Sequence, residues 1–103
     1  NKAMKAASNI PFRTLKCCRD VMNYAQETAK MGNPNSISDA AVSAELAHAG
    51  AMGAAINVKI NLKDIDDNQY CQRMQKQTDK IIKETEDALV LVRRTVSTIL
   101  NSD

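Results

Sequence analysis

The chain has little of several residue types, and each shortage narrows what the protein can be. Its 103 residues include no tryptophan, three glycines, two prolines and only 3% aromatic residues. The longest apolar run, Ala49 to Ile56, is far shorter than the ~20 residues that a membrane-spanning helix needs. No charged-then-apolar leader opens the chain. We therefore expect no membrane partner and a cytoplasmic location.

Cysteine, histidine and charge give no sign of a metal or nucleic-acid site. Cys17, Cys18 and Cys71 form an odd set with two adjacent members, which suits neither a disulfide framework nor a zinc site. We expect the adjacent pair to be small buried residues rather than reactive thiols. His48 is the only histidine and has only Glu45 at helical ligand spacing. Lys and Arg are scattered and the net charge is +2, so we expect no metal and no nucleic-acid partner.

Apolar residues recur every three or four positions, which is the spacing of one helix face, and nothing reads as a strand. The spacing predicts a first helix from Lys2 to Met31 and a last one from Asn68 to Leu100, the latter apolar on one face only. Pro11 lies inside the first pattern, so the helix either kinks there or restarts after a cap at Asn9. The apolar stripe keeps its phase across the proline, which favours the kink.

A polar turn follows the first helix and precedes a middle helix, which is predicted from about Ser38 to Leu62. Gly32 suits the left-handed position after a helix, and Pro34 cannot extend that helix. The following side chains can accept from the free amides of a new helix start: Ser36, Ser38 and Asp39. This segment is apolar or small on every side, so we expect it to be the central helix with no solvent face. The predicted fold is all-α, an up-and-down antiparallel bundle of three long helices.

Asn57 and Asn61 lie four residues apart and so share a face near the end of the central helix. Amides are costly to bury unpaired, which indicates a hydrogen-bonding role. The pattern fits equally well with two amides that close the helix end against a neighbouring loop, and spacing alone leaves both interpretations open.

Three ordered motifs resemble the cyclodeaminase and cyclohydrolase family of folate enzymes. They read Ile-Pro-Phe from Ile10, Gly-Asn-Pro-Asn-Ser-Ile-Ser-Asp-Ala from Gly32, and Gly-Ala-Ala-Ile-Asn-Val-Lys-Ile-Asn-Leu from Gly53. The family includes the C-terminal domain of formiminotransferase-cyclodeaminase and bacterial methenyltetrahydrofolate cyclohydrolases. Its Pro-Gly-Gly-Gly-Ser segment has no counterpart here, so the resemblance implies that residues 1–103 are the C-terminal half of such a domain.

The resemblance implies a homodimer that binds folate in a cleft near its interface. The reaction would be cyclisation of a formimino group on tetrahydrofolate with loss of ammonia, or hydrolysis of the methenyl bridge, with a tetrahydrofolate derivative as substrate and no cofactor. It implies that Asp39 is catalytic. It also implies four substrate-binding residues: Asn35, Ser38, Asn57 and Asn61. The alternative is a non-catalytic helical dimerisation or interaction module.

Overall fold

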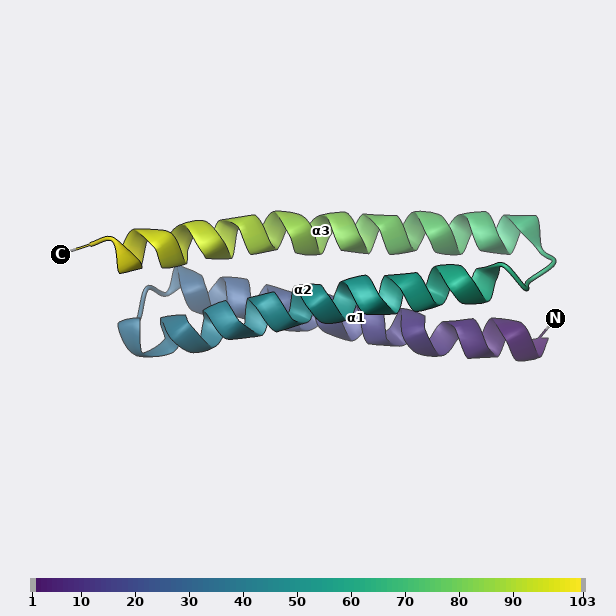
Figure 1. Ribbon diagram of the computed structural model, residues 1–103, viewed down its shortest axis with the longest axis horizontal. Coiled ribbons are helices and arrows are strands. Elements are labelled where there is room, and N and C mark those ends of the chain that lie inside the picture. Colours follow the sequence, from purple (N-terminus) through teal and green to yellow (C-terminus); the bar gives the residue numbers. More distant parts are fainter. Residues whose placement is uncertain (1, 103) are drawn as a thin grey trace.

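A computed structural model describes residues 2–102, which form three long helices and no strand within that range. Helix α1 spans Lys2–Lys30, α2 spans Pro34–Leu62 and α3 spans Asn68–Leu100. The helices lie along one axis and alternate in direction, so the two termini lie at opposite ends of a rod (Figure 1) that measures 58 × 17 × 16 Å. The predicted all-α antiparallel bundle is confirmed.

Helix α2 begins four residues earlier than the sequence pattern predicted. Asn33 is the residue before the first turn, and its side-chain oxygen accepts from the Asn35 N–H at 2.9 Å. Pro34 takes the first helical position, where its fixed φ fits and its missing N–H costs nothing. Gly32 has φ +67°, as predicted. The prediction that Ser36, Ser38 or Asp39 caps this helix is therefore wrong, and Asp39 lies in the second turn rather than the first.

Helix α3 is capped by Asp67. The carboxylate accepts from the Tyr70 N–H at 3.0 Å and from the Lys5 ammonium at 2.7 Å. These two donors, Lys5 first, hold the pKa of the Asp67 carboxyl below its ordinary value. The Tyr70 hydroxyl also bonds the buried Ser8 hydroxyl at 3.1 Å. The start of α1 is thereby attached to the start of α3.

Pro11 lies within α1, which continues through it as a single helix. The alternative of a fresh helix start capped by Asn9 is therefore not the one adopted. A kink at the proline stays a prediction.

Most of the buried residues of α2 are alanines. Two apolar clusters fill the bundle, one centred on Met22 and Leu89 and the other on Phe12 and Leu15. Helix α2 contributes mainly small side chains to both clusters: Ala40, Ala44, Ala47, Ala51 and Ala54. Because these side chains are short, α1 and α3 can approach the α2 backbone closely.

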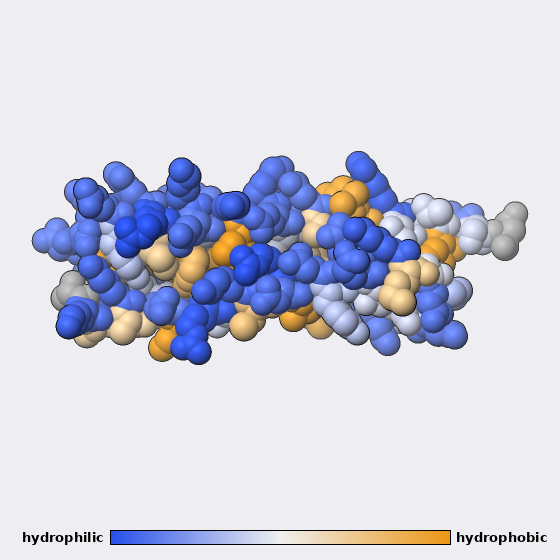
Figure 2. All heavy atoms as spheres, turned by 180° about the vertical axis from the view of Figure 1, so that it is seen from behind, coloured by the Kyte–Doolittle hydropathy of each residue, from blue (hydrophilic) through white to orange (hydrophobic). Residues whose placement is uncertain are grey.

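The other side of α2 is open, contrary to the prediction that this helix has no solvent face. Val42 is 59% exposed, Leu46 68%, and Ile56 and Ile60 55% each. Two neighbours cannot surround a helix that is apolar all round, so one apolar face is left over. Figure 2 shows the opposite face of the molecule, which lies behind α2 in Figure 1 and on which apolar patches also interrupt the hydrophilic surface.

The two glycines of α2 have different surroundings. A methyl group added at Gly50 would lie 2.9 Å from the Cys18 sulfur, so this glycine allows close contact with α1. A methyl group at Gly53 would meet nothing within 4 Å. Close packing therefore accounts for the glycine at Gly50 but not for the one at Gly53 within a single chain. A larger side chain such as leucine at Gly53 would not overpack the bundle.

Acid should weaken the fold partly through Asp67. A carboxyl whose pKa is lowered in the folded state stabilises the protein above its unfolded pKa of about 3.9, and this contribution disappears as the pH falls through the folded value. Asp67→Asn keeps a capping oxygen but removes the charge. We expect the Tm of the parent to fall more steeply between about pH 5 and about pH 3 than that of Asp67→Asn. Asp66→Asn at the exposed neighbouring position is the control, and equal slopes for the parent and Asp67→Asn would contradict this account.

The close contact at Gly50 can be tested by a pair of substitutions. In a helix interior, alanine is favoured over glycine by about 1 kcal/mol, but the new methyl group would press on the Cys18 sulfur. We therefore expect Gly50→Ala alone not to raise the free energy of unfolding. When Cys18→Ala is combined with Gly50→Ala, the contact is removed and the full advantage of alanine over glycine should be seen. Urea unfolding of both single variants and the double variant measures this coupling. A full gain in Gly50→Ala alone would show that the contact is not tight.

Candidate functional site

The Asp39 side chain lies on the exposed side of the second turn of α2. Its carboxylate forms no ion pair with any other residue between 2 and 102. Asn35, one helical turn before Asp39, and Ser38, one residue before it, are also exposed. Asn35 already uses its backbone N–H in the cap of α2, and its side chain points outward from the first turn. The motif thus gathers three predicted site residues at one end of the bundle.

Asp39 opens onto a cavity of about 250 Å³ between α1 and α2, which we call the Asp39 cleft. Its walls bring four hydroxyl groups to one carboxylate: Tyr24, Thr28, Ser36 and Ser43. Hydroxyls can donate to the carboxylate, accept from a ligand, or relay a proton between the two. The Asp39 cleft is therefore suited to a cationic or protonated ligand.

Sequence reasoning missed most of the hydroxyl wall of the Asp39 cleft. Ser36 and Ser43 lie three residues before and four residues after Asp39, so helical spacing could have placed them on its face. Tyr24 and Thr28 come from α1, and no spacing within α2 could find them. Tyr24 is 73% exposed in the structure, but no feature of the sequence marks it as part of a site.

Asn57 and Asn61 line a second and larger cavity between the same two helices, of about 480 Å³. Ile10 and Pro11 form its apolar wall on α1, and Gly53 contributes bare backbone on α2. Two of the three motifs singled out in the sequence therefore meet in this cavity, which we call the Asn57–Asn61 groove. The amides lie at its edge and do not close the helix end against a loop, which leaves them free to bind a ligand.

The structure does not bring the two cavities together within one chain. Asp39 and Asn57 share a side of the same straight helix, at a rise of about 1.5 Å per residue, so on the order of 27 Å separates them along α2. A carboxylate and an amide at this distance cannot hold the same small group. Within one chain, Asp39 therefore lies in a different cavity from Asn57 and Asn61.

A third cavity, of about 290 Å³, lies between α2 and α3 and holds charges that are already paired. Arg93 donates two hydrogen bonds to the Glu45 carboxylate, at 2.6 and 2.7 Å. The guanidinium lowers the pKa of Glu45 through these bonds. Since both groups are engaged, we interpret this pair as a link between the two helices.

The cysteines do not form a reactive site. Cys18 is half-buried and packs against Gly50, and burial, followed by the neighbouring Cys17, raises its thiol pKa. Cys17 is exposed, so the expectation that both members of the pair are buried is wrong for this residue.

In the described part of the chain, no three His, Cys, Asp or Glu side chains gather closely enough to hold a metal ion. None of the helices there is long and apolar enough to cross a membrane.

Comparison with known proteins gives one consistent family. A family model described as formiminotransferase-cyclodeaminase matches residues 1–80. Methenyltetrahydrofolate cyclohydrolase of Methylorubrum extorquens is 36% identical over 83 residues, which are 81% of this chain and 40% of that protein. Formimidoyltransferase-cyclodeaminase of Dictyostelium discoideum is 34% identical over 97 residues, 94% of this chain and 18% of that protein. The rat protein of the same name is 30% identical over 92 residues, 87% of this chain and 17% of its own. The chain thus spans less than half the length of each relative.

Proposed function

Because the chain belongs to the formiminotransferase-cyclodeaminase family, we propose that it acts in one-carbon folate metabolism. The reaction is either that of formimidoyltetrahydrofolate cyclodeaminase or that of methenyltetrahydrofolate cyclohydrolase. The relatives described above are named for a cyclodeaminase and for a cyclohydrolase. The observation that carries the proposal is the Asp39 cleft, where a carboxylate without an ion pair faces a wall of hydroxyl groups. The residues of the Asp39 cleft on α2 lie within the matched part of the chain.

The chemistry of both reactions suits this arrangement. Each acts on a one-carbon unit that carries positive charge, either a protonated formimino group on one folate nitrogen or a methenyl bridge between two, and a fixed carboxylate stabilises such a cation. Ring closure expels ammonia, and hydrolysis adds water, so each also needs a group that moves a proton. In this proposal Asp39 supplies the negative charge, and the hydroxyls of Ser43, Thr28 and Tyr24 pass the proton. Asn35 and Ser38 orient the substrate at the mouth of the Asp39 cleft.

The Asn57–Asn61 groove supplies a second substrate contact. Its amides can donate to and accept from the edge of a heterocycle, while Ile10 and Pro11 offer an apolar surface for a flat ring. We further propose that the protein works as a cytoplasmic homodimer that uses the tetrahydrofolate derivative as substrate and needs no cofactor.

The exposed apolar face of α2 favours a second candidate, a helical interaction module without catalytic activity. Large apolar side chains that stay exposed along a whole helix are typical of an interaction surface. In this case the three sequence motifs would serve only to pack the helices against one another. Activity and folate binding separate the two candidates.

The reaction can be identified by following the absorbance of 5,10-methenyltetrahydrofolate. We expect the protein to raise this absorbance when given 5-formiminotetrahydrofolate if it is a cyclodeaminase, and to accelerate its loss when given the methenyl compound if it is a cyclohydrolase. The spontaneous hydrolysis rate, measured without protein, is subtracted. A protein that changes neither rate and binds neither folate by calorimetry would contradict the proposed function and favour the interaction module.

The role of Asp39 can be tested by Asp39→Asn. This change keeps the shape of the side chain and removes its charge, so we expect turnover to fall about a hundredfold if the carboxylate faces the reacting carbon. Because Asp39 does not cap α2, the Tm should hardly change. Steady-state kinetics and thermal unfolding measure the two effects, with Asp20→Asn on the exposed side of α1 as the matched control. Unchanged turnover would remove Asp39 from the chemistry.

A further inference from the structure

The basic side chains of α1 and α3 are scattered along the sequence, but the fold brings several of them together in facing pairs. Each pair has one member on α1 and one on α3: Lys5 with Arg73, Lys16 with Lys80, and Lys30 with Arg94. Lys5 and Arg73 both lie over the Tyr70 ring, at 4.9 and 5.5 Å from its centre. The other two pairs each line a cavity between the helices. We call the surface that carries these pairs the α1–α3 groove.

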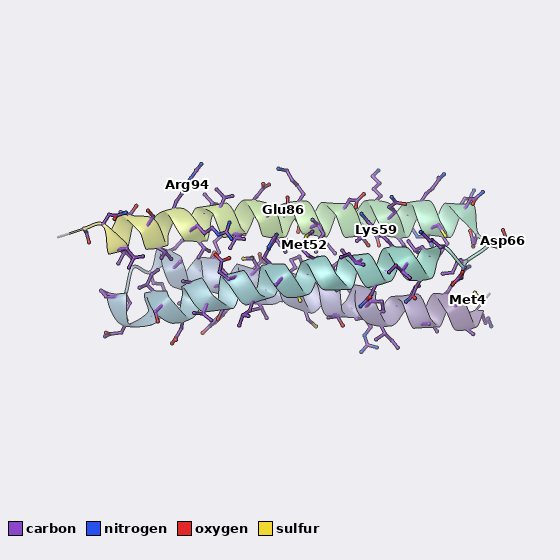
Figure 3. All side chains as sticks on the ribbon, in the orientation of Figure 1. Met4, Met52, Lys59, Asp66, Glu86 and Arg94 are labelled. Carbon is purple, nitrogen blue, oxygen red and sulfur yellow. The ribbon has the colours of Figure 1, made fainter. Side chains whose placement is uncertain are left out.

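The spacing of the basic residues explains why they line up. From Lys5 the row on α1 advances by eleven and then fourteen residues, and from Arg73 the row on α3 advances by seven and then fourteen. At about 3.6 residues per turn, these steps are close to whole numbers of turns, so each row keeps to one side of its helix. Arg94, at the end of the row on α3, points away from α2 (Figure 3).

Both lysines of the middle pair lack an acidic partner. The lysines at the two ends of the α1–α3 groove are held by Asp67 at 2.7 Å and by Glu27 at 3.4 Å. Lys16 and Lys80, in contrast, form no ion pair with any carboxylate between residues 2 and 102. Uncompensated positive charge is therefore concentrated at the middle of the groove, which favours a small anion over an extended polyanion such as a nucleic acid.

The middle pair lines a cavity of about 310 Å³, which we call the basic cavity. Arg19 adds a third cation to its wall, and Glu84 adds one carboxylate. The Nε atom of Arg19 lies 3.5 Å from the Asp20 carboxylate, and its two terminal amino groups have no partner among residues 2–102. The Lys16 ammonium lies 5.1 Å from the centre of the Phe12 ring, which holds it at the wall. Two of the cations are thereby held in place while their hydrogen-bond donors stay available.

The charges on the wall define the anion that suits the basic cavity. Three cations and one carboxylate leave two positive charges uncompensated. A phosphate monoester carries a charge of about −1.5 to −2 at neutral pH and has three strong acceptor oxygens. The planar guanidinium of an arginine can bind two of these oxygens at once, and a lysine binds phosphate as a point charge. A cavity of about 310 Å³ is at the lower end of the range for small-molecule sites, so it has room for a small organic group beside the phosphate.

We propose that the basic cavity binds a phosphate dianion, either free or at the end of a small organic monoester. Arg19 and the middle pair of lysines hold the phosphate. Gln77 lies on the same wall and can bond a hydroxyl group of an ester, over a floor formed by the buried Phe12 and Ile81. The site is independent of the proposed folate chemistry, because both cavities assigned to the folate lie between α1 and α2.

Isothermal titration calorimetry in a low-salt buffer without phosphate tests the class of ligand. We expect inorganic phosphate and ribose 5-phosphate to bind and ribose not to bind. Tighter binding of ribose 5-phosphate would identify a monoester as the ligand, whereas equal binding of the two would identify the free ion. Failure of both to bind, or equally tight binding of the dicarboxylate succinate, would overturn the proposal.

Paired substitutions test whether the phosphate lies in the basic cavity. Arg19→Gln and Lys80→Gln should each weaken the binding of inorganic phosphate at least about tenfold, because each removes a charged hydrogen bond. Arg13→Gln and Lys76→Gln remove the same charges from exposed positions outside the cavity and should leave the affinity nearly unchanged. Thermal unfolding of all four variants checks that the fold is kept. Equal losses in the cavity variants and the controls would show only a general attraction of anions, and the proposal would be wrong.

Glu84→Gln tests the same site in the opposite direction. This change removes the one carboxylate on the wall of the basic cavity, so we expect inorganic phosphate to bind about two- to fivefold more tightly. Glu86→Gln, at an exposed position of α3 outside the cavity, is the matched control and should have no effect. Weaker binding in Glu84→Gln, or an equal gain in both variants, would contradict a phosphate at this wall.

Discussion

Close contact between α2 and its two neighbours is the constraint on which the rest of the structure depends. A chain of this length buries little apolar surface in total, so its helices must approach closely along their whole length. Alanine at the buried positions of α2 and glycine at Gly50 make this possible, and Cys18 of α1 packs directly on the glycine. Larger side chains here would separate the helices and open the bundle. The polar links at the ends, from Lys5 to Asp67 and from Arg93 to Glu45, then fix the helices in their register.

The same close packing leaves α2 half covered. Its inner face is filled mostly with alanine, and several of its large side chains lie on the outer face, where residues such as Leu46 and Ile56 stay in water. Burial of a side chain of this size is worth about 1.5 to 3 kcal/mol, so a surface that exposes several of them gains much from a partner. Stability and function would therefore share one element, since the outer face that needs covering also carries the family motif residues.

The length of α2 explains why one copy has two separate cavities. A straight helix holds its two ends apart, so no flexibility of the bundle can bring Asp39 to Asn57.

The sequence by itself determined the helices, their order and the family. Apolar spacing located α1 and α3 to within one residue, and Gly32 marked the turn before α2, because these features depend on local geometry. Local chemistry was less decisive where several residues could fill the same role. Asn33 rather than Ser38 or Asp39 caps α2, since the proline that follows Asn33 is fixed in the shape of a first helical residue. Only the tertiary structure decided which side of α2 is open and which hydroxyls of α1 line the Asp39 cleft. These depend on how the helices lie against one another, and no spacing along a single helix records the position of its neighbours.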